Sequence, residues 1–240
     1  MLEVKDEGPF FSDITEGSDT LVIFFGGAAG GLGKKETPFE FLRATEHEPY
    51  SKFYLRDSNQ SQYQKGLEGL TTDVLDTVRF LKKRVAKAKT KNVICVGNCM
   101  GAFAAIYFGA RLKAKAVHAF SPVTTIDTMK RFGYGDHRAF KLSLRLLFIG
   151  TDKDSRDVNC LKAGLLKNTA FFLHYCPDYG PDARHVGRLK QTRRFTLLEY
   201  PGNDHFLAKR LREKGLLLRT ISETDTDAVK TIWRKAVKAI

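Results

Sequence analysis

Three residue types that can together carry out acyl transfer follow strand-like segments of this sequence. Cys99 lies between two glycines in Gly97-Asn98-Cys99-Met100-Gly101, His205 follows a later strand, and Asp178 or Asp182 can supply a carboxylate. In such a set the thiolate attacks a carbonyl carbon, the imidazole moves the proton, and the carboxylate orients the imidazole. The sequence therefore predicts a cysteine nucleophile. The alternative is that Cys99 is a buried and unreactive thiol, as many cysteines are.

The residues around Cys99 predict a strand, a sharp turn and a helix. Residues 92–96 are rich in β-branched side chains, and 102–108 contain good helix formers. A side chain at Gly97 or Gly101 would collide with the neighbouring strand and helix, so the glycines allow a tight turn. Cys99 is thereby expected at the end of a strand and at a helix N-terminus, where the positive end of the helix dipole favours a thiolate.

The rest of the chain alternates between strand-like and helix-like segments. This pattern predicts an α/β fold with a doubly wound, mostly parallel sheet in a single domain over residues 1–240. The carboxyl ends of its strands would gather Cys99, Asp178, Asp182 and His205, and ligands bind at such ends. The segment at about 123–168 is a long insertion, interpreted as a lid over the site. The predicted strands are 21–25, 52–55, 92–96, 116–120, 170–175 and 195–200, with a possible edge strand at Phe10-Phe11.

Helices are expected between these strands and after the last one. Thr71 or Thr72 can cap a helix that runs to about residue 89, and Ser222-x-x-Asp225 can begin the last helix. Further helices are expected at about 155–166, 183–189 and 206–212. His118, His174 and His185 are interpreted as structural.

The order of nucleophile, acid and histidine along the chain resembles that of the α/β-hydrolase superfamily. The resemblance runs from about Leu21 to the end of the chain. The cysteine is similar to that of dienelactone hydrolases, and the turn to that of small bacterial esterase-like proteins. The resemblance implies a triad of Cys99, His205 and Asp178, with Asp182 as the alternative acid. Asp178 is preferred because it comes directly off its strand, whereas Asp182 could cap the following helix.

The resemblance also implies an oxyanion hole, a pair of N–H groups that stabilise a negatively charged carbonyl oxygen. The N–H of Met100 and one from Gly27 or Ala28 are expected to form it. Residues 26–33 hold five glycines, but they lack the phosphate-loop pattern, so a nucleotide site is a weak alternative. No metal or cofactor is expected.

The positive charge of the sequence is unevenly distributed. The net charge is +13 overall, and residues 1–60, with 6 basic and 11 acidic side chains, are net acidic. The excess of basic side chains in residues 61–240 favours an anionic or carrier-linked small-molecule substrate. Arg138 and Arg145 of the insertion are candidate contacts with it. An ordinary solvated helix face is the alternative. No nucleic-acid-binding motif accompanies the charge.

The apolar runs, the cysteines and the site residues predict where the protein is located and what it does. No apolar run is long enough to span a membrane, and four cysteines without a paired pattern predict free thiols in the cytoplasm. The expected activity is a hydrolase or acyltransferase acting on an ester, lactone or thioester through a cysteine-linked acyl intermediate. The alternative is a non-catalytic binding or scaffolding protein, because cysteine replaces the usual serine and the oxyanion loop is irregular.

Overall fold

The computed structural model describes residues 8–27, 39–138, 155–189 and 194–240. Their strands form one seven-stranded sheet in the order β1-β3-β2-β4-β5-β6-β7. Only β1 is antiparallel to its neighbour, and the other pairs are parallel. The predicted α/β fold with a doubly wound, mostly parallel sheet is therefore confirmed. The strands are β1 (Phe10–Asp13), β2 (Thr20–Phe25), β3 (Ser51–Leu55), β4 (Asn92–Asn98), β5 (Ala116–Phe120), β6 (Ala170–Tyr175) and β7 (Phe195–Glu199).

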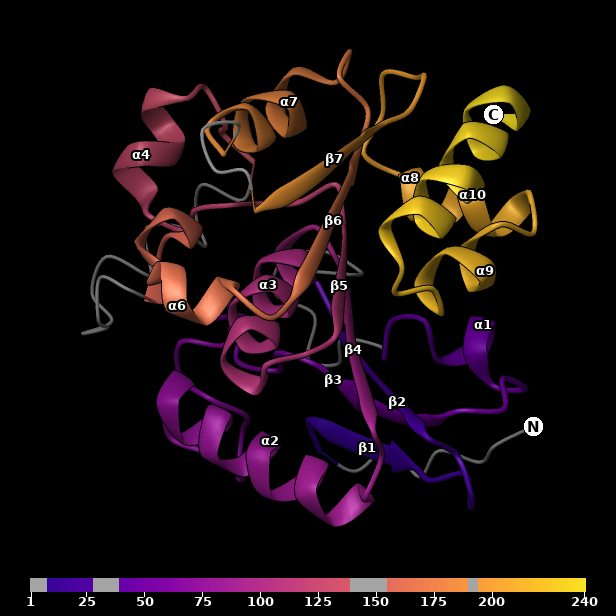
Figure 1. Ribbon diagram of the computed structural model, residues 1–240. Helices are drawn as coiled ribbons and strands as arrows, with labels where there is room; N and C mark the ends of the chain where they lie inside the picture. The colour runs from indigo at the N-terminus through magenta and orange to yellow at the C-terminus, as the bar shows by residue number, and fades with distance from the viewer. Residues whose placement is uncertain (1–7, 28–38, 139–154, 190–193) are drawn as a thin grey trace.

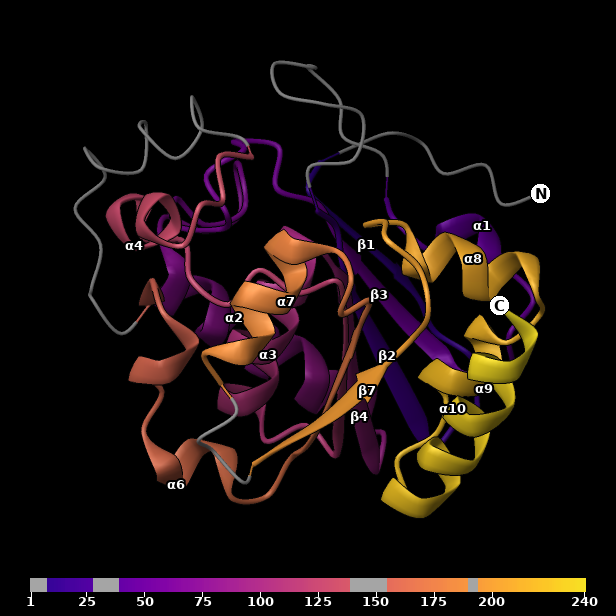
Figure 2. The same cartoon turned by 90° about the horizontal axis from the view of Figure 1, so that it is seen from above.

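Helices cover both faces of the sheet (Figures 1 and 2). One face packs against α2 (Val74–Ala88), α3 (Met100–Leu112), α4 (Thr128–Gly133), α6 (Ala163–Leu166) and α7 (Gly180–Gly187). The other face packs against α1 (Leu42–Thr45), α8 (Leu207–Glu213), α9 (Leu217–Ile221) and α10 (Thr226–Ala239). Because water reaches neither face, the central strands are continuous apolar runs, and two separate hydrophobic clusters lie on the two sides of the sheet.

Two helix starts differ from the predicted ones. Helix α2 is capped by Asp73, whose side chain accepts the N–H of Asp76 at 2.7 Å. Helix α10 is capped by Asp225, which accepts N–H groups of the first turn. Asp73 lies one residue after Thr72, and Asp225 three residues after Ser222. In both cases an aspartate supplies the cap, and its carboxylate also interacts favourably with the helix dipole.

The edge strand β7 is covered by the last helix. Trp233 of α10 donates its indole N–H to the backbone oxygen of Glu199 at 2.8 Å. This contact fixes the end of β7, from which the chain continues to His205.

The insertion between β5 and β6 is described only in part. It contains α4, a short 3₁₀ helix, η2 (Val158–Cys160), and α6, so the helix expected at 155–166 is two short pieces. Arg145 and the basic stretch at 140–149 lie outside the described residues, and the predicted lid stays a prediction. Within the described segments, no helix has the length and apolar character needed to cross a bilayer.

Candidate active site

The turn between β4 and α3 holds Cys99 in an unusual backbone conformation. Its φ is 55° and its ψ is −115°, a strained combination for a side chain with a Cβ. A Cβ on Gly97 would overlap the backbone of Gly101, and a Cβ on Gly101 would overlap the carbonyl of Phe25 in β2. The predicted steric role of both glycines is therefore confirmed. The turn places the thiol at the carboxyl edge of the sheet, directly before α3.

His205 lies beside this turn and is held by Asp182. The imidazole Nδ1 lies 2.8 Å from Asp182 Oδ2 and 3.0 Å from Oδ1. Since a carboxylate only accepts, Nδ1 carries the proton. The Asp182 side chain is fully buried, and that of His205 is 18 % exposed. The other ring nitrogen, Nε2, is buried and forms no regular hydrogen bond within the described residues, so it can exchange a proton with Cys99.

The acid beside the histidine is Asp182, and the preference for Asp178 was wrong. Asp178 is exposed, in a turn closed by the bond from Tyr179 N–H to the Cys176 oxygen, whereas Asp182 is the carboxylate bonded to His205. Asp182 does not cap α7, because the cap position belongs to Tyr179. It lies in the first turn of the helix, facing inward. The sequence spacing after β6 allowed both residues, and only the position of the helix start separates them.

The charge state of His205 follows from its neighbours. Burial lowers its pKa, but the hydrogen bond with Asp182 and the interactions with Cys99 outweigh burial and raise the pKa to about 10. The neighbours of the ring thus favour an imidazolium at neutral pH.

Arg138 lies behind this pair and not in the pocket. Its Nη1 donates to Asp182 Oδ1 at 2.8 Å, and its Nε donates to Asp136 Oδ1 at 2.8 Å. The expectation that Arg138 contacts substrate is therefore not supported by its position. Its partner Asp136 is buried, and no sequence pattern points to it because the segment has no strand or helix periodicity.

The other predicted structural histidines are buried and bonded. His118 Nε2 lies 2.8 Å from the oxygen of Glu223, and His174 Nδ1 lies 2.9 Å from the Tyr200 hydroxyl. His185 Nε2 lies 2.9 Å from Asp136 Oδ2. Burial lowers the pKa of His118 to about 4, so it is neutral at pH 7.

The expected oxyanion donors are only partly available. Met100 is the first residue of α3, where backbone N–H groups have no partner inside the helix. Gly27 lies against the turn, but its N–H donates to Glu40 Oε2 at 2.7 Å. Asn98 Nδ2 lies 3.5 Å from the other oxygen of this carboxyl group. Ala28 lies outside the described residues. Burial raises the pKa of Glu40.

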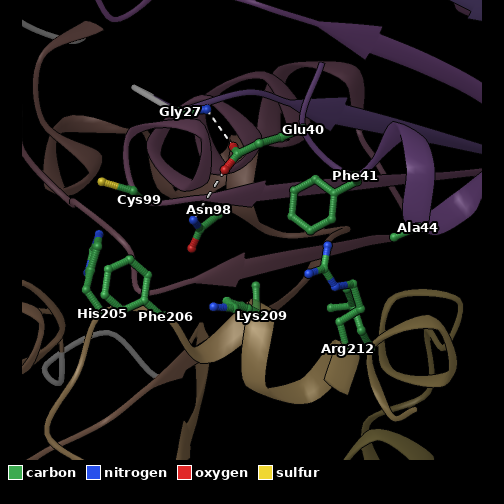
Figure 3. Close-up of a pocket in the computed structure, with 12 residues that line it drawn as sticks. Gly27, Glu40, Phe41, Ala44, Asn98, Cys99, His205, Phe206, Lys209 and Arg212 are labelled. Carbon is green, nitrogen blue, oxygen red and sulfur yellow. Dashed lines mark hydrogen bonds between the residues drawn. The ribbon is translucent and has the colours of Figure 1, made fainter. Parts of the chain in front are cut away.

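A cavity of about 420 Å³ opens in front of Cys99 and His205 (Figure 3). Two cations of α8, Lys209 and Arg212, line it opposite Glu40, together with the aromatic side chains of Phe41 and Phe206. Lys209 lies 3.8 Å from Glu213, and no ion pair of Arg212 is found among the described residues. Sequence reasoning missed both cations. Their signal is the spacing of three residues between Lys209 and Arg212, which places both on one side of α8.

No protein-family model matches the sequence, and no curated protein is significantly similar to it. Solved structures are similar in fold. A chain of the glycosylation associate protein complex of Streptococcus agalactiae matches with a TM-score of 0.64 and 16% identity over 90% of this chain and 44% of that chain. The present chain thus spans less than half of that neighbour.

Two further neighbours match along most of their length. The capsule O-acetyltransferase of Neisseria meningitidis serogroup A has a TM-score of 0.59 and 12% identity, over 87% of this chain and 90% of that chain. Carboxyl esterase 2 of the fungus Tuber melanosporum has a TM-score of 0.53 and 13% identity, over 99% and 87%. At such identities the similarity establishes the fold, and the fold of this chain is that of the α/β-hydrolases.

Proposed function

We propose that the protein is a hydrolase or acyltransferase that cleaves an ester or thioester through an acyl intermediate on Cys99. One observation carries the proposal. Cys99 on its strained turn and His205 line a single cavity, and the buried carboxylate of Asp182 binds the far nitrogen of the His205 ring at 2.8 Å. This is the order of a nucleophile, a base and an orienting acid. The esterase and the O-acetyltransferase with this fold are compatible with it.

The reaction follows from the protonation of this group. The Cys99 thiolate attacks the carbonyl carbon and forms a tetrahedral oxyanion. When the oxyanion collapses, the bond to the leaving oxygen or sulfur breaks, and His205 Nε2 gives its proton to the leaving group. Water or an acceptor hydroxyl then loses a proton to His205 and attacks the thioester, which releases Cys99. Asp182 keeps the ring oriented through both steps.

The oxyanion would be stabilised by backbone N–H groups at the start of α3 and in the loop after β2. Met100 N–H fits this role directly. Gly27 N–H can join only after the Glu40 carboxyl group has released it, because the 2.7 Å hydrogen bond occupies that donor. Substrate binding is therefore expected to displace or protonate Glu40.

The proposed substrate carries a negative charge. Lys209 and Arg212 line the cavity, whereas Arg138 and Arg210 are paired with carboxylates. An anionic group on the acyl or leaving part would thus find two cations across from the nucleophile. The test compares 4-nitrophenyl hemisuccinate with its methyl ester. Replacing Lys209 and Arg212 by Met should lower kcat/KM for the charged ester only. Lys214→Met is the control, because Lys214 ends the same helix but does not line the cavity.

The covalent step is tested by trapping. Wild-type protein mixed with a 4-nitrophenyl ester should gain the acyl mass on the peptide that contains Cys99, and Cys99→Ala should not. Cys99→Ala that retains full turnover would refute the mechanism.

A second candidate is a binding protein that has kept the fold without turnover. The hydrogen bond from Gly27 N–H to the Glu40 carboxyl group favours this second candidate. If Glu40 occupied that N–H permanently, the N–H could not stabilise an oxyanion in a transition state. Under this candidate, iodoacetamide would show no preference for Cys99 over the three other cysteines, and no ester would be cleaved.

A further inference from the structure

The guanidinium of Arg138 lies where the carboxylate of Asp182 meets the imidazole of His205. Its Nη1 is 2.8 Å from Asp182 Oδ1 and 3.1 Å from His205 Nδ1. Both nitrogens carry hydrogen, so they do not bond to each other, and each donates to the carboxylate between them. Oδ1 accepts from Arg138, and His205 Nδ1 lies nearer to Oδ2, at 2.8 Å, than to Oδ1, at 3.0 Å. Both donors thus hold the same carboxylate.

A second carboxylate fixes the far side of this guanidinium. Asp136 accepts from Arg138 Nε at 2.8 Å and from the backbone N–H of Arg138 at 3.1 Å. It also accepts from Arg131 Nη2 and from His185 Nε2, both at 2.9 Å. These contacts place Arg138 independently of Asp182.

His185, the histidine that contacts Asp136, is neutral. His185 Nδ1 accepts the backbone N–H of Thr124 at 3.2 Å, which leaves the ring proton on Nε2, facing Asp136. Burial lowers the pKa of His185. The positive charges that face Asp136 are therefore those of Arg131 and Arg138, and the charges alternate from Arg131 through Asp136 and Arg138 to Asp182.

We infer that Arg138 is a positioning residue that fixes the Asp182 carboxylate and whose charge favours proton release from both Cys99 and His205. This inference rests on the proposed function of the same site. It assigns Arg138 a role other than substrate binding, and it joins the insertion after β5 to the triad.

The electrostatic part of the inference has a definite sign. A positive charge 3.1 Å from Nδ1 opposes an imidazolium, and the same charge attracts a thiolate at Cys99. Loss of the charge makes both groups hold their protons more tightly. The other titratable or charged groups that face Cys99 and His205 are the same in every Arg138 variant, so they do not change the comparison. They are Asp182 in α7 and Tyr179 beside it, Glu40 before α1, and Lys209 and Arg212 of α8.

The first experiment measures the rate of Cys99 alkylation by iodoacetamide against pH in the full-length protein. Arg138→Gln should move the midpoint up by about 0.5 to 1 pH unit, the size expected for a nearby charge in partly aqueous surroundings. Arg138→Lys keeps the charge and should keep the midpoint. Its kcat should still fall, because an ammonium lacks the planar pair of N–H donors with which a guanidinium holds a carboxylate. Arg138→Met is a second neutral variant if the glutamine variant does not fold.

The control is Arg188→Gln. Arg188 pairs with Asp157 at 2.6 Å and packs against the same insertion, but it does not contact the triad. It should cost similar stability without moving the midpoint. Equal shifts in the Arg138 and Arg188 variants, or no shift in either neutral Arg138 variant, would overturn the inference.

A second readout does not need a reactive thiol. In the Cys99→Ala background, the His205 ring titration followed by NMR should move to higher pH when Arg138→Gln is added. If this shift occurs while wild-type Cys99 is not alkylated selectively, the proposed function is wrong but the role of Arg138 stands. If wild-type Cys99 forms an acyl intermediate and neither readout moves, the role of Arg138 is wrong and the proposed function stands.

Discussion

Replacing Asp182 by Asn removes a charge from the triad with little change of shape. Asp182 is fully buried and bonds both His205 Nδ1 and Arg138 Nη1. An amide can donate to Nδ1 and hold the ring in the tautomer with its proton on Nε2, where it cannot accept the thiol proton. We expect kcat to fall about 10²- to 10⁴-fold, as for other orienting carboxylates.

The effect of this change on stability depends on pH. The pKa of His205 is raised to about 10 from an unfolded value of 6.5, which corresponds to roughly 5 kcal/mol shared between Asp182 and Cys99. We assign about 2 kcal/mol to Asp182, the size of a charged hydrogen bond in a partly exposed site. Because the folded pKa is raised, this stabilisation is complete below pH 6.5 and is lost as pH rises through about 10.

The assay combines turnover of a 4-nitrophenyl ester with urea unfolding of both proteins from pH 6 to 10. The difference in free energy of unfolding between wild type and Asp182→Asn should shrink over that interval. Asp178→Asn is the matched control, since Asp178 is exposed, and it should leave kcat and stability unchanged. A loss of kcat in the Asp178 variant with normal kcat in the Asp182 variant would refute the assignment of the acid.

Three further predictions concern other parts of the chain. Glu40→Ala should raise kcat/KM for small acetyl esters about three- to tenfold by freeing Gly27 N–H, and a decrease would show that Glu40 assists the reaction instead. Gly101→Ala should lower the free energy of unfolding by about 3 kcal/mol or more in urea, because its Cβ would overlap the Phe25 carbonyl, while Gly164→Ala in α6, with open space, should not destabilise. The pKa of buried His118 is lowered to about 4, so the stability that depends on its neutral ring is complete above pH 6.5 and is lost as pH falls through 4. Between these two pH values, the free energy of unfolding of His118→Gln should therefore fall less than that of wild type.

The strands and the nucleophile turn could be predicted because they depend on local patterns. β5 and β6 match the predicted apolar runs, since a parallel strand covered on both faces reads as a short continuous apolar segment. The two glycines around Cys99 have a steric requirement that no other residue meets, and so the turn is also visible in the sequence.

The acid of the triad, and the residues that contact the site from behind, Glu40 and Arg138, depend on tertiary contacts. Asp178 and Asp182 are four residues apart, one before and one after the start of α7 at Gly180, and the position of that start decides which of them meets His205. Glu40 reaches Gly27 across 13 residues, and Arg138 reaches Asp182 across 44. Neither contact has a periodicity or motif that a sequence could display.

The hydrogen bond between Trp233 and Glu199 gives the protein a built-in optical reporter. Trp233 is the only tryptophan of the chain, so intrinsic emission excited at 295 nm comes from one place, the contact between α10 and the end of β7. Release of α10 into water would shift this emission to longer wavelength even while the central sheet remained folded. A fluorescence transition that precedes the loss of far-UV circular dichroism would therefore identify the C-terminal helix as a separate unfolding unit, adjoining the loop that carries His205.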